Sequence, residues 1–335
     1  MALWTAVRGT GLAMAAFPIA LGGVGLCDTP AHSELFTILR MVGAGDLSMA
    51  RLLEGHINAI SLVCRYGTPA QIADLAQSVN AGSLSAVWGA DDNQGLKLVK
   101  ERSGTRLQGR KILASGAGFV TRPLVTVAGP EGQLLCLLRL DEHHPHDTSM
   151  WQAQGMTATA SGAVDFSGLV IDGNNIIGAP GDFMRQPHFS GGAWRFCAAH
   201  LGAAERLVDL YRIHLVGRGR SGDPFQLQRF AHCAAAIKTA RFWVEEAARR
   251  LAVEDCDPMA VVAFANLTRM VTERSALDVM EAVQRGVGLT SFVRPNPIER
   301  ICRDLSTYLR QPVPDLAMTD AARFLLESML PAGEL

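Results

Sequence analysis

Apolar side chains recur at helical spacing in the first part of this 335-residue chain. Leu35–Val42 and Leu47–Cys64 place apolar residues three or four positions apart, which is the repeat of a helix buried on one face. A third run, Pro69–Val79, follows Thr68, a residue type that caps helix N-termini. The pattern therefore predicts helices over residues 1–80.

The pattern changes in residues 83–175, where short apolar runs alternate with glycine, proline and aspartate. Short runs rich in β-branched residues between such turn formers are typical of strands. The expected strands are Leu84–Trp88, Leu124–Val127, Leu134–Leu138 and Val164–Ile171. We expect them to form a small antiparallel barrel or sandwich.

Helical spacing returns in residues 190–330. Pro224–Leu251 and Pro258–Val287 each carry apolar side chains at alternating three- and four-residue steps, if Arg241 is counted in the first stripe. Helices of about 30 residues exceed the globular mean, so they favour a bundle or an oligomer core over a surface helix. Short connections predict packing at shallow angles.

These patterns predict an α+β fold with three domains. An N-terminal helical domain covers residues 1–82, a β-domain covers 83–180, and a C-terminal four-helix-type bundle covers 190–335. This order of helices, then strands, then a helical bundle is uncommon, so it narrows the choice of fold.

Composition and charge exclude several classes of protein. Apolar residues make up 48% of the chain, charged residues 19%, and the net charge is −1, which is typical of a globular protein. No basic block predicts binding to nucleic acid or to a membrane surface. The seven cysteines include no CxxC pair and favour reduced thiols in a cytoplasmic protein over disulfides or zinc ligands.

The N-terminus has one feature of a secretory signal, because Arg8 precedes the apolar run Gly11–Leu26. The run contains Pro18 and the glycine-rich segment Gly22–Gly25, and no small-x-small cleavage site follows it. It is also too short for a membrane span. We expect a folded segment here.

Five local segments, taken in order, resemble the acyl-CoA dehydrogenase family. They are the Pro…GGxG turn at 18–25, the GT-x-x-Q helix start at 67–71, the G-x-K strand at 109–115, the G-M-x-x-T…V-x-F segment at 155–166 and the ER-x-x-RD motif at 299–304. Each segment alone is weak. Together they cover nearly the whole chain, and the resemblance implies that family's fold with a shortened N-terminal helical domain.

The resemblance also implies a flavin, expected as FAD, against the β-domain. From the motif match, we expect Ile112, Leu113 and Ser115 to contact the flavin ring, with the Ser115 hydroxyl near flavin N5. We expect the segment around Trp88 to contact the flavin through its main chain. The alternatives are that Ser115 is only a turn serine before Gly116 and that Trp88 is a core residue.

In the same family an Arg…Phe-Gly…Gln element reaches across a dimer to the FAD phosphates. Arg218 and Arg220 occupy that place here, but the Phe-Gly pair is absent, and a solvated basic loop is the alternative. Gln284 and Gly288 match the glycine turn that meets the adenosine end, with one glycine lost. The resemblance implies a homodimer or homotetramer.

The catalytic carboxylate of the family is missing. Its usual position, counted from Asp304, falls on Pro312, and its alternative position falls on Trp194. Neither side chain can accept a proton. The replacements we consider are His56, whose ordinary pKa suits acid–base work, and Glu54, which could orient it or act itself. A structural role for His56 is the alternative.

A second histidine group lies in a loop. His143, His144 and His146 surround Pro145. The spacing resembles a metal site, but a run of polar residues around a proline favours a solvated turn. We expect no metal ion there.

Three functions remain open. The first is a flavin-dependent dehydrogenase that oxidises an acyl-CoA-like thioester by hydride transfer to flavin N5 and passes electrons to an acceptor. The second is a monooxygenase on the same fold, which uses O2 and reduced flavin supplied by a flavin reductase. The third is a non-catalytic homologue. Fold alone does not separate them.

Overall fold

The computed structural model describes residues 2–27, 32–102, 104–141, 143–253, 256–310, 312–331 and 333–334. Its helices are α1 (Ala2–Gly9), α2 (His32–Gly45), α3 (Leu47–Tyr66), α4 (Pro69–Asn80), α5 (His188–Gly191), α6 (Trp194–Gly217), α7 (Pro224–Leu251), α8 (Pro258–Val287), α9 (Pro297–Tyr308) and α10 (Pro314–Ser328). No helix within these residues is long and apolar enough to cross a membrane.

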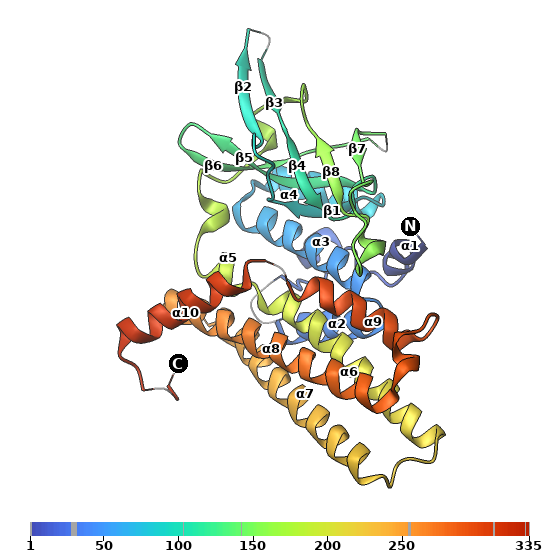
Figure 1. Ribbon diagram of the computed structural model, residues 1–335. Coiled ribbons are helices and arrows are strands. Elements are labelled where there is room, and N and C mark those ends of the chain that lie inside the picture. The colour runs from blue at the N-terminus through green and yellow to red at the C-terminus, as the bar shows by residue number, and fades with distance from the viewer. Residues whose placement is uncertain are drawn as a thin grey trace. The chain divides into compact units, whose positions relative to one another are not determined.

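The strands lie between α4 and α5 in the chain (Figure 1). They are β1 (Leu84–Trp88), β2 (Lys97–Glu101), β3 (Gly104–Gln108), β4 (Arg110–Ala114), β5 (Val120–Gly129), β6 (Gly132–Leu137), β7 (His146–Asp147), β8 (Gly162–Asp165), β9 (Val170–Ile171) and β10 (Ile176–Ile177). The predicted α+β fold class is therefore confirmed.

The chain forms two compact units. Unit 1 comprises residues 1–31, 51–152 and 157–185, and unit 2 comprises residues 32–50, 153–156 and 186–335. The division into domains 1–82, 83–180 and 190–335 follows the type of element along the chain, and it stays a prediction.

Unit 1 is built on two sheets. Six strands follow the order β10-β6-β5-β2-β3-β9, and β1 joins the same sheet beside β5; β4, β8 and β7 form the second sheet. Most neighbours are antiparallel, as expected, but β1 and β2 both pair parallel with β5. A parallel pair needs a long crossover, and the segment from β2 to β4 supplies it.

One predicted strand is wrong. Val164–Ile171 is not continuous, because β8 ends at Asp165 and β9 begins at Val170. Between them the Asp165 carboxylate accepts a hydrogen bond from the Ser167 amide, and Gly168 adopts a positive φ of 85°. An Asx turn followed by a left-handed glycine reverses the chain, which the apolar pattern alone does not reveal.

Helix α4 begins as the sequence predicts. The Thr68 hydroxyl accepts the amide of Gln71, and the Gln71 side chain accepts the amide of Thr68, so both N-terminal donors are satisfied. The Gln71 amide group also donates to the carbonyls of Asn174 and Ile176. The cap therefore joins the start of α4 to β10 within unit 1.

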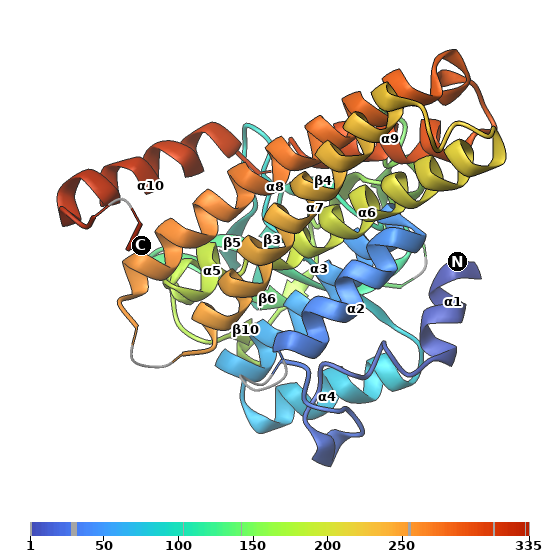
Figure 2. The ribbon, with the colours of Figure 1, turned by 90° about the horizontal axis from the view of Figure 1, so that it is seen from below.

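Unit 2 is a helical bundle in which α6, α7 and α8 run side by side (Figures 1 and 2). The predicted ranges of the two long helices are confirmed for α7 and α8. Asp223 and Asp257 accept backbone amides at the two N-termini, and each is followed by proline. Proline at this position lacks an amide that would otherwise be unpaired.

Helix α6 is the buried centre of unit 2, and α2 packs closely against it. A Cβ placed on Gly43 of α2 would lie 2.2 Å from the carbonyl oxygen of Ala199. One placed on Gly202 of α6 would lie 1.9 Å from the carbonyl oxygen of Arg40. Only glycine permits this separation, so the two glycines set how closely the helices pack.

Candidate flavin site

Strand β4 carries an exposed apolar side chain at a break in its pairing. Arg110, Lys111 and Ala114 pair with β8, and the register shifts between Lys111 and Ala114. Within this bulge Leu113 has a φ of 52° and is 58% exposed, while Ile112 is half-buried. Positive φ is unusual for a leucine, and bulges often re-aim side chains beside functional sites. The bulge turns an apolar surface outward.

Ser115 follows this apolar edge and is held on both sides. Its backbone carbonyl accepts the indole N–H of Trp88 at 3.0 Å, and its Oγ accepts the Ser161 hydroxyl at 3.2 Å. Ser161 Oγ lies 2.9 Å from the Thr159 hydroxyl. Because Ser115 Oγ acts as an acceptor in the bond from Ser161, its own proton is available to a further acceptor. The half-buried Ser115 therefore presents an oriented hydroxyl donor.

Beside this bulge, a buried lysine forms an ion pair with an exposed aspartate. Lys111 is fully buried, and its Nζ lies 2.6 Å from an Asp91 carboxylate oxygen and 2.8 Å from Thr126 Oγ1. Burial lowers the pKa of Lys111, and the hydrogen bond to Asp91 opposes that shift. The amide of Ile112 also donates to the Ala90 carbonyl. The segment after β1 is thus fixed against β4.

Trp88 belongs to the core. It is 3% exposed and lies 6.3 Å from Phe166, ring centre to ring centre. Its indole N–H donates to the Ser115 carbonyl, so its side chain supports Ser115. A main-chain contact of the Trp88 segment with a flavin stays a prediction.

His56 is placed as a structural residue. It is fully buried, its Nε2 donates to the Ala13 carbonyl at 2.9 Å, and its Nδ1 accepts the Ser85 amide at 3.0 Å. Trp4 packs edge-on against the ring at 5.0 Å. Burial lowers the pKa of His56 to about 4. With both ring nitrogens engaged, the imidazole has no position left for a substrate proton.

Glu54 is engaged as well. One carboxylate oxygen lies 2.7 Å from the Arg51 guanidinium, and the other accepts the side-chain amide of Asn58. The side chain is buried on α3. The structure does not join Glu54 to His56 by any hydrogen bond, since the two residues lie on different faces of the helix.

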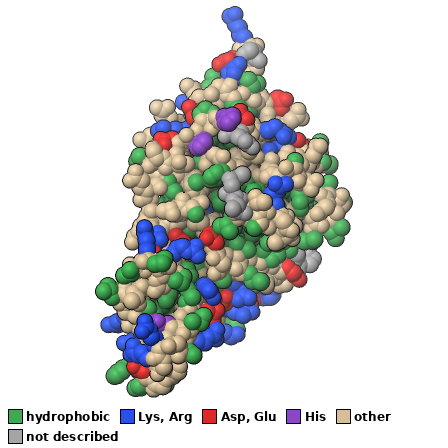
Figure 3. Space-filling model, turned by 90° about the vertical axis from the view of Figure 1, so that its right-hand side faces the viewer, with side chains coloured by type: hydrophobic (Ala, Val, Ile, Leu, Met, Phe, Trp, Pro, Cys, Tyr) green, Lys and Arg blue, Asp and Glu red, His purple; other side chains and the backbone are tan. Residues whose placement is uncertain are grey.

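The phosphate-contacting residues expected from the resemblance lie at one end of unit 2. Arg218 caps the C-terminal end of α6, Arg220 lies 2.8 Å from the Asp223 carboxylate, and the Gln226 side chain, with its amide oriented to satisfy both of its polar atoms, accepts a hydrogen bond from the Arg220 guanidinium at 2.9 Å. Gln284 is half-buried on α8, and Gly288 closes that helix with a φ of 82°. Figure 3 shows Lys and Arg side chains gathered over this end of the bundle.

The positions of the missing carboxylate are unsuited to acid–base work. Trp194 is fully buried at the start of α6, and Pro312 is exposed with its carbonyl bonded to Arg269. The nearby Asp304 is buried, where its carboxylate accepts the Met156 amide at 2.6 Å. Burial raises the pKa of Asp304, which acts here as a structural acceptor.

The histidine loop does not assemble a metal site. His144 Nε2 contacts the Asp165 carbonyl at 2.7 Å, and His146 Nδ1 contacts the His144 carbonyl at 2.9 Å. Across the part of the chain that the structure describes, no three His, Cys, Asp or Glu side chains converge. These histidines bind backbone carbonyls of their own loop and of β8.

The arrangement in unit 1 fits one face of a flavin. An isoalloxazine ring needs an apolar wall and hydrogen-bond donors near N5 and the carbonyls. The bulge at Leu113 would supply the wall, and the oriented Ser115 hydroxyl would supply a donor beside it. The sequence pointed to both residues, and their contacts with a flavin stay a prediction. It did not point to Ser161, whose only signal is its place two residues after Thr159 in a hydroxyl-rich segment.

Comparisons with known proteins support this fold. Residues 194–310 match the family model described as the C-terminal domain of acyl-CoA dehydrogenase. The FMN-bound structure of dibenzothiophene monooxygenase TdsC from Paenibacillus sp. A11-2 is similar, with a TM-score of 0.84 at 20% identity over 98% of this chain and 91% of that chain. No curated protein matches the chain.

Two further solved structures share the fold. Methanesulfinate monooxygenase MsuC from Pseudomonas fluorescens has a TM-score of 0.83 at 17% identity, covering 98% of this chain and 90% of its own. A nitrososynthase from Micromonospora carbonacea var. africana has a TM-score of 0.79 at 20% identity, covering 97% and 88%. The chain therefore has the acyl-CoA dehydrogenase-like fold, and residues 194–310 match the C-terminal domain of that family.

Proposed function

We propose that this protein is a flavin-dependent monooxygenase that uses reduced flavin and O2. The observation that carries the proposal is the Ser115 hydroxyl, held by Ser161 and the Trp88-bound carbonyl beside the exposed Leu113. The names of the similar structures, two of which are monooxygenases, point in the same direction. Bound reduced flavin would supply two electrons, so that one oxygen atom of O2 enters the product and the other leaves as water.

The residues of β4 would bind and orient the ring. Leu113 and Ile112 would pack against it and exclude water, which strengthens polar interactions at the reacting edge. Ser115 would donate a hydrogen bond to a ring acceptor such as N5 of the oxidised flavin, and Ser161 would keep the hydroxyl oriented toward it. None of these roles requires a carboxylate.

Oxidation of an acyl thioester is the weaker alternative. It needs a base to remove the α-proton while hydride leaves the β-carbon. Pro312 and Trp194 cannot act as that base, His56 has both nitrogens engaged, and Glu54 is held by Arg51 and Asn58. A monooxygenase supplied with reduced flavin does not abstract that proton.

We further propose FMN as the preferred flavin, with FAD as the alternative. The loop at Arg218 and Arg220 lacks the Phe-Gly pair, and the turn at Gly288 has lost one glycine of the adenosine contact. The two arginines could still bind a phosphate bidentately, in a flavin held by a second copy of the chain. This implies a homo-oligomer that receives its electrons from a flavin reductase.

The proposal is tested by supplying FMN, NADH, O2 and a flavin reductase to the protein with a panel of thiophenes, indoles and amines. The reaction balances as substrate plus O2 plus reduced FMN giving oxygenated substrate, water and oxidised FMN. Isotope-labelled O2 should appear in one product only when the chain is present. If reductase alone gives the same oxidation, or no labelled product forms with any member of the panel, the oxygenase is rejected.

A further inference from the structure

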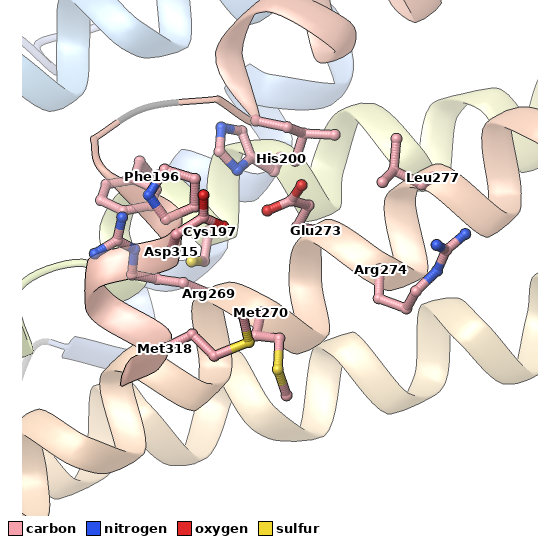
Figure 4. Close-up of a pocket in the computed structure, with 12 residues that line it drawn as sticks. Phe196, Cys197, His200, Arg269, Met270, Glu273, Arg274, Leu277, Asp315 and Met318 are labelled. Carbon is pink, nitrogen blue, oxygen red and sulfur yellow. The ribbon is translucent and has the colours of Figure 1, made fainter. Parts of the chain in front are cut away.

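Unit 2 contains a cavity of about 230 Å3 among α6, α8 and the start of α10. This is below the roughly 300–1,000 Å3 of pockets that hold drug-sized molecules, so it suits a ligand of about one ring. Figure 4 shows His200, Glu273, Arg269 and Asp315 arranged around the same space, from three different helices. Nothing in the proposed flavin chemistry uses these residues.

His200 lines this cavity and contains an unpaired, buried polar atom. The side chain is 3% exposed, and its Nε2 has no hydrogen-bond partner among the residues that the structure describes. Phe196 and Tyr308 pack against the ring at 5.6 and 4.4 Å and fix it in place. Burial, with a contribution from Arg269, lowers the pKa of His200 to about 3, so the imidazole is neutral at physiological pH. A buried polar atom without a partner is costly unless a ligand or water satisfies it.

Arg269 is a cation with spare donors. It lies with its guanidinium carbon 5.5 Å from the centre of the Phe196 ring and donates to the Pro312 carbonyl. Within the described residues it has no carboxylate at ion-pair distance. The other arginines nearby are paired, Arg274 with Asp278 and Arg310 with Glu273. Arg269 therefore retains unused N–H groups for an anion.

The rest of the wall limits the ligand further. Met270, Leu277 and Met318 make one side apolar. Burial raises the pKa of the Cys197 thiol to about 12, so this cysteine stays protonated and does not act as a nucleophile. The carboxylates of Glu273 and Asp315 also line the cavity and would repel a second negative charge.

We propose that this cavity is a binding site for a compact organic monoanion with an apolar body, such as an aromatic or short aliphatic acid. Its acid group binds the Arg269 guanidinium, its polar edge meets His200 Nε2, and its apolar body packs against Phe196 and Met318. The site lies wholly within unit 2, and the proposal stands whether or not the chain is an oxygenase.

Isothermal titration of the full chain, without flavin and then with FMN, tests the site. The probes are benzoate, benzenesulfinate and phenol as alternative acid groups, benzamide as the neutral counterpart and phthalate as the dianion. We expect benzoate or benzenesulfinate to bind at least tenfold more tightly than benzamide and phthalate. Neutral benzamide cannot form a charge-assisted pair with arginine, and the second negative charge of phthalate is repelled by Glu273 and Asp315. Tightest binding of phenol would assign the site to phenols instead and contradict the proposal.

Matched variants locate the binding. Arg269→Gln should weaken the best acid probe at least tenfold, whereas Arg274→Gln should not, since Arg274 lines the same cavity but is paired with Asp278. Met318→Trp, at an exposed position of α10, should fill the cavity and abolish binding with Arg269 intact. This variant keeps the test valid if Arg269→Gln does not fold. The proposal fails if no acid binds at millimolar concentration, or if Met318→Trp binds as the wild type does.

Discussion

At the scale of single residues, the structure assigns different roles to Ser115 and His56, which the sequence alone presents equally as candidate catalytic groups. Ser115 is half-buried with a proton to offer, while His56 is buried with both nitrogens occupied. The sequence identified both as candidates because it shows the type of each side chain but not the hydrogen bonds that the side chain makes. Their partners, Ser161, Ala13 and Ser85, come from distant segments and were not predictable from local pattern.

The role of Ser115 is tested by replacement with alanine. Loss of one hydrogen bond to the flavin should weaken FMN binding roughly fivefold and shift the absorption spectrum of the bound flavin. Ser149→Ala, in an exposed turn, is the control and should bind FMN as the wild type does. Unchanged affinity and spectrum in the Ser115 variant would remove Ser115 from the site.

The buried neutral state of His56 predicts a pH-dependent stability. Its pKa is lowered in the folded protein, so its contribution is complete above the unfolded value of about 6.5 and is lost as pH falls toward about 4. Between pH 7 and 5 the free energy of unfolding should fall by about 2 kcal/mol from this residue. Urea unfolding of the wild type and of His56→Gln measures the difference.

In His56→Gln the amide can replace both hydrogen bonds but does not titrate, so the decline between pH 7 and 5 should shrink by that amount. His143→Gln, in the exposed histidine loop, should leave the decline unchanged. If the His56 variant loses stability with acid as steeply as the wild type, the histidine is not a buried neutral group.

At the scale of elements, helical spacing predicted the bundle better than it predicted the strands. The ranges of α7 and α8 follow from long apolar stripes and from Asp–Pro starts that satisfy the first amides. The hairpin of β2 and β3 was missed because its faces are mostly polar and exposed, and β8 and β9 were merged because their turn is set by Asp165 and Gly168. Periodicity reports burial, and strands exposed on both faces do not show it.

The contact of α2 with α6 gives a prediction at this scale. Gly202→Ala should destabilise the protein by roughly 1–3 kcal/mol, since overpacking against the Arg40 carbonyl forces the helices apart. Gly217→Ala, in the last turn of the same helix, has no atom within 4 Å of the added methyl and should be neutral or slightly stabilising. Thermal and urea unfolding of both variants measure this. Equal effects would show that the close approach does not limit packing.

At the scale of the whole molecule, the order of elements narrowed the choice of fold, and five segments that resemble the acyl-CoA dehydrogenases predicted it. The same signals did not predict the chemistry. The family model covers residues 194–310, and solved structures with the same fold include enzymes of different activity. Fold is shared by these proteins and activity differs, so function must be argued from the site. The loss of a carboxylate at Pro312 and Trp194 is readable in the sequence. The engagement of the replacements His56 and Glu54 required the structure.

The most direct test of the account is an anaerobic titration of the FMN-loaded protein with acyl-CoAs of different chain length, following the flavin band at about 450 nm. We predict that no acyl-CoA bleaches the band, that dithionite or a flavin reductase does, and that admitted air restores it with consumption of O2. Bleaching by any acyl-CoA would contradict the account, because it would require a base for the α-proton and make the protein a dehydrogenase.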